Sequence, residues 1–345
     1  MSGDLTSQEV VVSQDGGVLS AFPDTDEELQ QRLARGMTAV GDRLAQVIDH
    51  DDEFIAEAAG HLARAGGKRF RPLLTLLCAE VGTGITDQVV DAAVGVELTH
   101  LASLYHDDVM DEAELRRGVP SANVRYGNAV SILVGDLLFG TASAVIADLG
   151  PEAVKVQAAT FVRLCSGQIR DERGPADGVD PVQDYLAVLA DKTGSLISTA
   201  AWYGATFGGC NDHTREALTA YAEKLGVVFQ LADDLLDVSS DAADSGKTPG
   251  TDLREGKATL PVLYARASTD PADAELQAML AGPIADPGQV AEAVELLRAH
   301  PAMARARRHT QQVADEARVL LADLPERPAV HALRALVDGV ADRTA

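Results

Sequence analysis

Aromatic residues are scarce in this chain, and alternating runs of β-branched residues are absent from it. Phe, Trp and Tyr make up 4% of its 345 residues. Because strands are enriched in aromatic and β-branched residues, a β-sandwich is not expected. Apolar residues instead recur at intervals of three and four, as at Leu73, Leu74 and Leu77. That spacing is helical, so the sequence predicts an all-α protein.

Positive charge is also in short supply. The chain has 29 Lys and Arg against 53 Asp and Glu, which gives a net charge of -24. Nucleic acids and anionic membranes both require a basic footprint on their protein partners. Neither is therefore expected to be a main partner.

Cysteine and membrane signals are sparse as well. Cys78, Cys165 and Cys210 are odd in number and far apart, which favours free thiols in a reducing compartment. The N-terminus shows no basic segment followed by an apolar one, as a secretory signal would. The most apolar stretch, 129–149, contains Asp136, and we interpret it as a buried bundle helix with no membrane span. We expect a cytoplasmic protein.

One domain accounts for most of the chain. Residues 1–24 mix Ser, Gly, Asp and Gln, which is typical of a disordered tail. Asp24, Thr25 and Asp26 are candidate caps for a first helix. No Pro- or Gly-rich linker divides the remainder. Residues 25–345 are therefore predicted to form a single-domain bundle of ten or more helices around a deep central cavity.

Two copies of one acidic pattern stand out. Residues 107–111 read DDVMD and residues 233–237 read DDLLD, so each copy is DDxxD. On a helix the first and last carboxylates share one face and repel each other, so a cation is expected at each copy. Mg²⁺ suits such a place, because it is bound through one or two carboxylates plus substrate phosphate. One copy among 53 acidic residues could be a solvated helix face. Two copies, each followed by basic residues, favour a metal–diphosphate site.

A basic segment that begins with two glycines is the third signal. Residues 66–72 read GGKRFRP. The glycines free the backbone, and Pro72 is expected at the first position of a helix. Lys68, Arg71 and the helix N-terminus could together hold an anion. Taken alone, a basic turn at a helix start is common.

Together these residues resemble the trans-isoprenyl diphosphate synthase, or polyprenyl synthetase, family. The matching stretches follow the family's order: GGKRFRP (66–72), HLASLYHDDVMDEAELRRG (100–118), GDLLFG (135–140), KTGSL (192–196), FQLADDLLD (229–237) and GKTPGTDLREGKATLP (246–261). The resemblance implies an isoprenoid synthase fold, a homodimer and a polyprenyl synthetase catalytic domain over residues 25–345. It also implies a Mg²⁺-dependent condensation of an allylic diphosphate with isopentenyl diphosphate, which releases pyrophosphate.

The resemblance further implies roles for single residues. The metal ligands, for three Mg²⁺ ions per site, would be Asp107, Asp111 and Asp233. The carboxylates that support them would be Asp108, Asp234 and Asp237. The allylic diphosphate would be held by Arg116, Lys192, Lys247 and Lys257. The diphosphate of isopentenyl diphosphate would be held by Lys68, Arg71, His100 and Arg117. The residues beside the forming carbocation would be Thr193 and Gln230.

The chemistry of these residue types agrees with the implied reaction. Breaking the allylic C–O bond leaves charge on pyrophosphate, which Mg²⁺, Lys and Arg neutralise. A hydroxyl or amide oxygen shielded from water can stabilise the cation. Two cationic pockets would hold the reacting carbons close together. Residues 239–257, rich in Gly, Asp and Ser, are a candidate lid or an ordinary loop.

Three other readings compete with this one. A class I terpene cyclase also uses DDxxD in an all-α fold, but pairs it with a different metal motif and has no second diphosphate pocket. A non-catalytic subunit of a prenyl synthase pair should have lost aspartates or the basic segment. A plain helical scaffold leaves the coincidence of motifs unexplained.

The length of the product is predicted from the helix that carries Asp107. Thr99, Ala102 and Ser103 lie eight, five and four residues before it, and all are small. One helical turn rises about 5.4 Å, close to one extended isoprene unit, so a bulky residue there would act as a floor. We therefore expect a medium- or long-chain all-trans polyprenyl diphosphate, with geranylgeranyl diphosphate as the alternative product.

Overall fold

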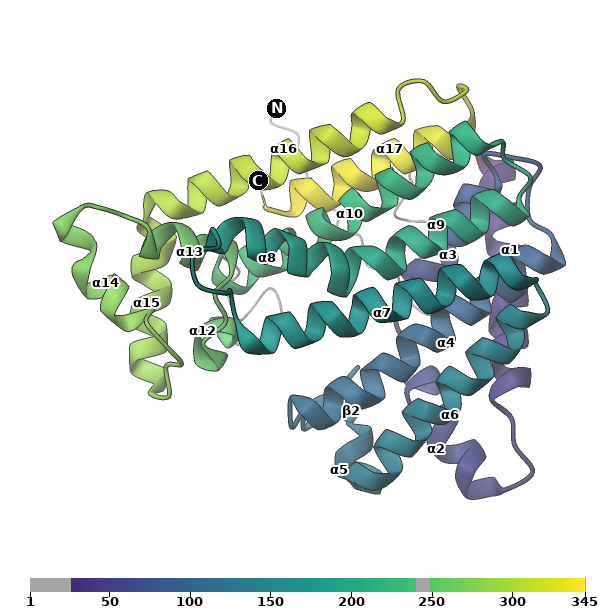
Figure 1. Cartoon of the computed structure of the whole chain (residues 1–345), viewed down its shortest axis with the longest axis horizontal. Helices are drawn as coiled ribbons and strands as arrows, with labels where there is room; N and C mark the ends of the chain where they lie inside the picture. The colour runs from purple at the N-terminus through teal and green to yellow at the C-terminus, as the bar shows by residue number, and fades with distance from the viewer. Residues whose placement is uncertain (1–25, 240–248, 345) are drawn as a thin grey trace, which may run out of the picture. The chain divides into compact units, whose positions relative to one another are not determined.

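The expectation of an all-α fold is confirmed. A computed structural model describes residues 26–239 and 249–344, which are helical apart from loops and one short hairpin (Figure 1). The predicted disordered tail lies outside the described residues. The chain forms two compact units. The predicted cavity involves motifs from both units and stays a prediction.

Unit 1 comprises the described residues up to 162, together with 196–222 and 323–336. Its helices are α1 (Glu27–Ile48), α2 (Glu53–Arg64), α3 (Phe70–Ala79), α4 (Asp87–Met110), α5 (Ala122–Tyr126), α6 (Asn128–Ala147) and most of α9 (Ser195–Phe207). Strands β1 (Leu115–Arg116) and β2 (Val119–Pro120) pair antiparallel. Three helices contribute residues to both units: α7 (Pro151–Arg173), α10 (Asp212–Ser239) and α17 (Pro328–Ala341).

Unit 2 comprises residues 163–195, 223–322 and 337–345, as far as they are described. Its elements are α8 (Pro181–Leu189), the π-helix η1 (Ala190–Gly194), α12 (Thr251–Glu255), α13 (Leu260–Arg266), η2 (Pro271–Asp273), α14 (Ala274–Met279), α15 (Pro287–Ala299), α16 (Pro301–Leu320) and η3 (Asp342–Thr344). Within this unit α13 packs against α8, α15 and α16.

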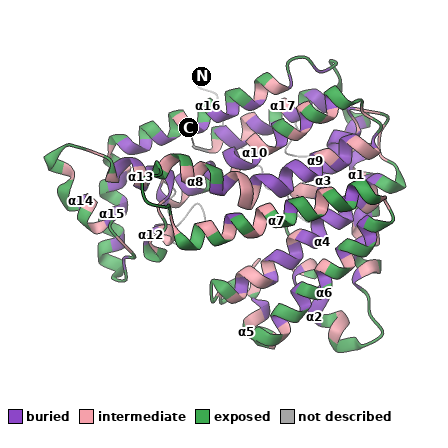
Figure 2. Cartoon of the chain, in the orientation of Figure 1, coloured by how far each residue is buried: buried purple, intermediate pink, exposed green. Residues whose placement is uncertain are grey.

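Helix α4 forms the centre of unit 1. It packs against α1, α3 and α6, and most of its residues are buried (Figure 2). A helix that is covered on several sides must be apolar around much of its circumference, as this one is. Gly95 of α4 and Gly135 of α6 allow the two helices to approach closely, because a Cβ at either position would collide with Ile146 or His106. The motif GDLLFG is thereby explained in part by packing.

Helix α6 is buried on one face only. Ser131, Val134 and Leu138 are buried, whereas Leu133 is 66% exposed and Ile132 is 43% exposed. The interpretation of this stretch as a buried bundle helix is therefore correct for its inner face and wrong for its outer face. Among the described residues it is the one helix long and apolar enough to cross a membrane, judged by length and composition.

The sequence signal for the first helix is confirmed. The side chain of Asp26 accepts a hydrogen bond from the backbone N–H of Leu29 at 2.9 Å, which caps α1. The three cysteines are free thiols, as predicted.

Candidate active site

The first acidic copy lies at the C-terminal end of α4. Asp107 is half-buried in the last turn, Asp108 is fully buried, and Asp111 is exposed as the residue that ends the helix. The backbone N–H of Asp111 still donates to the carbonyl of Asp107 at 2.8 Å. The helical spacing predicted for Asp107 and Asp111 therefore continues to the end of the motif.

A short hairpin follows this motif and is fixed to it by a buried ion pair. Arg117 and Gly118 both have positive φ, 54° and 77°, as a two-residue type I′ turn requires. The turn places Arg116 so that its Nε donates to Asp108 Oδ1 at 2.6 Å. The other oxygen of Asp108 is buried without a hydrogen-bond partner among the described residues. Asp108 thus supports the site by holding an arginine.

The hairpin also meets the glycine pair of the basic segment. The guanidinium of Arg117 donates to the carbonyl of Leu62 at 2.8 Å and to that of Gly66. Gly67 has φ 133°, and a Cβ there would stand 2.7 Å from Arg117 Cζ. Glycine is required at this position for backbone conformation and for space. Two motifs that are distant in sequence are brought together here.

A cationic cluster surrounds these contacts. Arg71 is half-buried near Glu97 and Arg117, and burial lowers its pKa to about 10. Its Nε has no hydrogen-bond partner among the described residues. Burial and the neighbouring Arg71, Arg117 and Arg116 hold the pKa of His100 well below its usual value. The cluster combines several arginines with an unused buried donor on Arg71, which suits an anion.

Two details of the basic segment complete unit 1. Lys68 is exposed in the loop before α3. Helix α3 begins at Phe70, so Pro72 is its third residue and the prediction of a first-position proline is wrong. The first turn tolerates proline because its N–H groups lack helical partners.

The residues proposed to set product length all lie in the interior of unit 1. Thr99, Ala102 and Ser103 are 3%, 0% and 9% exposed. The hydroxyls of Thr99 and Ser103 donate to the carbonyls of Gly95 and His100, each at 2.8 Å. Their small size is as expected, and their role stays a prediction.

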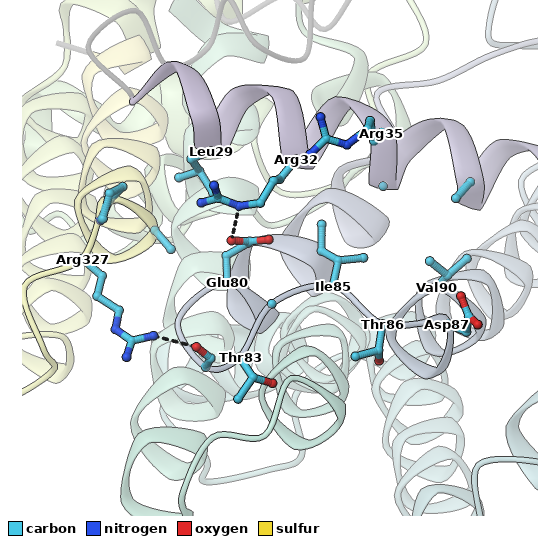
Figure 3. Close-up of a pocket in the computed structure, with 16 residues that line it drawn as sticks. Leu29, Arg32, Arg35, Glu80, Thr83, Ile85, Thr86, Asp87, Val90 and Arg327 are labelled. Carbon is cyan, nitrogen blue, oxygen red and sulfur yellow. Dashed lines mark hydrogen bonds and ion pairs between the residues drawn. The ribbon is translucent and has the colours of Figure 1, made fainter.

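A surface cavity of about 650 Å³ lies elsewhere in unit 1, beside the first turn of α4. Arg32, Glu80 and Arg327 line it, and Arg32 Nε is 2.8 Å from Glu80 Oε2 (Figure 3). From Asp87 at this end of α4 to Asp107, twenty residues at 1.5 Å each span about 30 Å. None of the predicted site residues lines this cavity.

The second acidic copy lies in unit 2, near the C-terminal end of α10. Asp233 is exposed, and Asp234 is 5% exposed. Asp234 accepts hydrogen bonds from the hydroxyl of Tyr185 and from Gln230 Nε2, the latter at 3.0 Å. Burial, with Asp252 and Asp237 nearby, raises the pKa of Asp234 well above its usual value. A bound cation would relieve this repulsion.

The last carboxylate of this copy organises the following segment. The two oxygens of Asp237 accept from the backbone N–H groups of Thr251 and Asp252, at 3.2 and 3.1 Å. Lys257 is exposed, and its Nζ is 2.5 Å from Glu255 Oε2. Lys247 and the rest of residues 240–248 of the candidate lid lie outside the described residues.

Lys192 and Thr193 lie in the π-helix η1 between α8 and α9. Lys192 Nζ donates to Asp171 Oδ2 of α7 at 2.7 Å. A π-helix inserts an extra residue into a helical ladder, and such turns are frequent at functional sites. The pattern of hydrophobic residues gave no indication of it.

Sequence reasoning missed several polar residues that the structure brings into the two clusters. They are Glu97, Asp171, Tyr185 and Asp252. Glu97 is 2% exposed, and burial raises its pKa although Arg117, Arg71 and Arg69 oppose that shift. Glu97 stands in an apolar run, three residues before His100, and that position could have identified it from the sequence as a site residue.

Both acidic copies suit a divalent cation that arrives with its substrate. Among the described residues, no three Asp, Glu, His or Cys side chains converge as a complete metal site. Mg²⁺ typically takes one or two carboxylates and completes its shell with water and phosphate oxygens. The unpartnered oxygen of Asp108 and the crowded carboxylates near Asp234 fit that mode.

The all-α fold and paired acidic and basic clusters define a class of diphosphate-handling proteins, and comparison with known proteins identifies the family. The polyprenyl synthetase family model matches residues 52–297. Nonaprenyl diphosphate synthase of Mycobacterium tuberculosis is 49% identical over 306 residues, which cover 87% of this chain and 91% of that protein. The chain belongs to the polyprenyl synthetase family.

Solved structures agree. Geranylgeranyl pyrophosphate synthase from Corynebacterium glutamicum, complexed with calcium and isoprenyl diphosphate, matches with a TM-score of 0.85 and 41% identity, over 92% of this chain and 98% of that one. A decaprenyl diphosphate synthase from Rhodobacter capsulatus matches with a TM-score of 0.84 and 34% identity, over 92% of this chain and 99% of that one. The predicted isoprenoid synthase fold and trans-prenyltransferase class are confirmed.

Proposed function

We propose that this enzyme condenses an allylic diphosphate with isopentenyl diphosphate to give an all-trans polyprenyl diphosphate of medium or long chain. One observation in unit 1 carries the proposal. Arg71 and Arg117 lie close to a neutral His100, on the helix that also carries Asp107. A cyclase of a single diphosphate substrate has no use for such a second anion pocket.

Each predicted residue is assigned to one of the two substrates, to the forming cation or to Mg²⁺. Arg71, His100 and Arg117, with Lys68, hold isopentenyl diphosphate. Lys192, Lys257 and Arg116 hold the allylic diphosphate, and Lys247 joins them. Thr193 and Gln230 face the forming cation. Mg²⁺, when bound at Asp107, Asp111 and Asp233, neutralises charge on the leaving pyrophosphate. Three ions per site and a cytoplasmic location belong to this proposal.

A homodimer is also part of the proposal. Exposed apolar residues on two adjoining helices of unit 1 support it: Ile132, Leu133 and Leu137 of α6 with Val154, Phe161 and Val162 of α7. The ring centroids of Phe139 of α6 and Phe161 of α7 are 4.4 Å apart, so the two helices lie side by side there. Contiguous exposed apolar residues of this kind commonly mark protein interfaces. A second copy of the chain would remove the patch from water.

The product length is supported by the relatives and by α4. Nonaprenyl and decaprenyl diphosphate synthases are among the similar proteins. The small residues Thr99, Ala102 and Ser103 agree with a chain that grows past them. A geranylgeranyl product stays the alternative, since several of the similar structures are of geranylgeranyl pyrophosphate synthases.

Incubation with Mg²⁺, labelled isopentenyl diphosphate and farnesyl or geranylgeranyl diphosphate tests the activity. We expect products longer than geranylgeranyl diphosphate, and EDTA should abolish them. A Ser103→Phe variant should yield shorter chains, because a large ring would stand one turn below Asp107. A cyclic hydrocarbon, or no turnover by wild type, would overturn the proposal. If a folded Ser103→Phe enzyme makes products of the same length as wild type, the small residues of α4 do not set product length.

A further inference from the structure

The π-helical turn that carries Lys192 and Thr193 is held by an arginine that bridges two carboxylates. Arg163 of α7 donates from Nε to Asp191 Oδ1 at 2.8 Å and from a terminal nitrogen to Glu223 Oε1 of α10 at 2.6 Å. Asp191 is the residue directly before Lys192. Burial lowers the pKa of Arg163, but its bonds to Glu223 and Asp191 raise it overall, so the arginine stays charged.

Further contacts come from the same face of α7. Arg170 forms an ion pair with the second oxygen of Asp191, and Asp171 accepts from Lys192 Nζ at 2.7 Å. Arg163, Gly167, Arg170 and Asp171 are spaced by four, three and one, so they share one side of the helix. Both oxygens of Asp191 are thereby engaged by arginines.

Two glycines allow the turn to sit close to its neighbours. A Cβ at Gly167 of α7 would stand 2.7 Å from the backbone nitrogen of Lys192 and 3.1 Å from Asp191 Cβ. A Cβ at Gly194 would stand 3.1 Å from the carbonyl oxygen of Glu223. The turn is therefore packed against α7 on one side and α10 on the other, within unit 2.

We propose that Arg163, Arg170 and Asp191 are positioning residues that fix the π-helical turn, and that through it they determine where Lys192 and Thr193 meet the allylic substrate. The inference rests on the proposed function, because it takes Lys192 and Thr193 as groups that meet the allylic substrate. The three positioning residues themselves are assigned no contact with substrate. A π-helix has poorer intrinsic stability than an α-helix, so it persists where surrounding contacts impose it. Small displacements of a group that binds a reacting substrate can cost on the order of a hundredfold in rate.

The test compares steady-state constants for the two substrates. Arg163→Gln and Asp191→Asn should each lower kcat/KM for the allylic diphosphate on the order of tenfold to a hundredfold. KM for isopentenyl diphosphate should stay near the wild-type value, because its proposed ligands lie in unit 1. Arg163→Lys should recover only part of the loss, since an ammonium lacks the planar fork that reaches two carboxylates. Arg173→Gln is the matched control, an exposed arginine of α7 whose side chain donates only to the carbonyl of Gly174 among the described residues.

A second test uses glycine variants, which leave every charged side chain in place. Gly167→Ala should displace the turn and reproduce the allylic defect, whereas Gly282→Ala, whose Cβ meets nothing within 4 Å, should not. In a Lys192→Ala, Thr193→Ala background, Arg163→Gln should cause little further loss, because the effect passes through those residues.

The outcomes are separable. Wild-type enzyme that makes no polyprenyl diphosphate refutes the proposed function. Active wild type with Arg163→Gln and Gly167→Ala indistinguishable from their controls refutes the positioning role. Equal losses of kcat/KM for both substrates would also overturn the positioning role. So would an undiminished effect of Arg163→Gln in the Lys192→Ala, Thr193→Ala background.

Discussion

Single residues in unit 1 show how charge is arranged before substrate binds. Glu97 is a buried carboxylate with Arg71 and Arg117 as neighbours, and Asp108 is a buried carboxylate with Arg116. Each buried carboxylate holds an arginine beside it. An incoming diphosphate therefore meets cations that are already fixed in place, which lowers the entropic cost of binding.

The aspartate clusters are expected to be essential for turnover and dispensable for folding. Asp107→Ala and Asp233→Ala should each lower kcat at least about a hundredfold, because charge on pyrophosphate is then left uncompensated. The midpoint of thermal unfolding without metal should not fall, since like-charge repulsion is removed. Asp91→Ala, an α4 carboxylate paired with Arg43, serves as the control. Near-normal turnover by either variant would contradict the assignment.

His100 should make the protein less stable in mild acid. The folded state keeps it neutral, whereas the unfolded chain protonates it near the ordinary pKa of about 6.5. As pH falls below that value the unfolded state binds the extra proton, so the free energy of unfolding decreases, by about 1 kcal/mol between roughly pH 7.5 and 5.5.

Urea denaturation at both pH values measures this effect. The His100→Gln variant should lose about 1 kcal/mol less than wild type over the same interval. His213→Gln, at an exposed position, should behave as wild type does. The same pH dependence in all three proteins would show that His100 is not the group responsible.

At the scale of elements, the contact of the hairpin with the glycine pair joins two motifs. Gly67→Ala should raise KM for isopentenyl diphosphate about tenfold or more, because the new methyl group would displace Arg117. Gly150→Ala is the matched control, since Gly150 has φ 105° but its Cβ would meet nothing within 4 Å. Backbone strain is common to both variants, so only a Gly67-specific effect on this substrate supports the contact.

The same elements show how much of the fold and of the candidate site the sequence predicts. Helical periodicity and the Asp26 cap predicted where helices form, because those signals are local. The DDxxD, GGKRFRP and KTGSL motifs predicted the metal- and diphosphate-binding residues, and that assignment stays a prediction. The π-helical turn and the contact of Arg117 with Gly66 depend on packing between distant segments, which spacing alone does not encode. The exposed face of α6 was missed because its outward residues are as apolar as its buried ones.

At the scale of the whole molecule, the apolar patch on α6 and α7 predicts self-association. Leu133→Asp should shift sedimentation from a dimer toward a monomer, because a charge would be placed in the apolar contact. Val319→Asp is the control, since Val319 is exposed at 71% and lies outside the patch. A monomeric wild-type protein, or a dimer unaffected by Leu133→Asp, would contradict the prediction.

The position of both DDxxD copies at the ends of α4 and α10 has a consequence for dynamics. A helix macrodipole places partial negative charge at its C-terminus. Four carboxylates therefore stand where the backbone field already disfavours them: Asp107, Asp108, Asp111 and Asp237. Without a cation, the last turns of both helices are electrostatically frustrated and should fray. Addition of Mg²⁺ with pyrophosphate should slow amide hydrogen exchange there, while the first turns of the same helices change little.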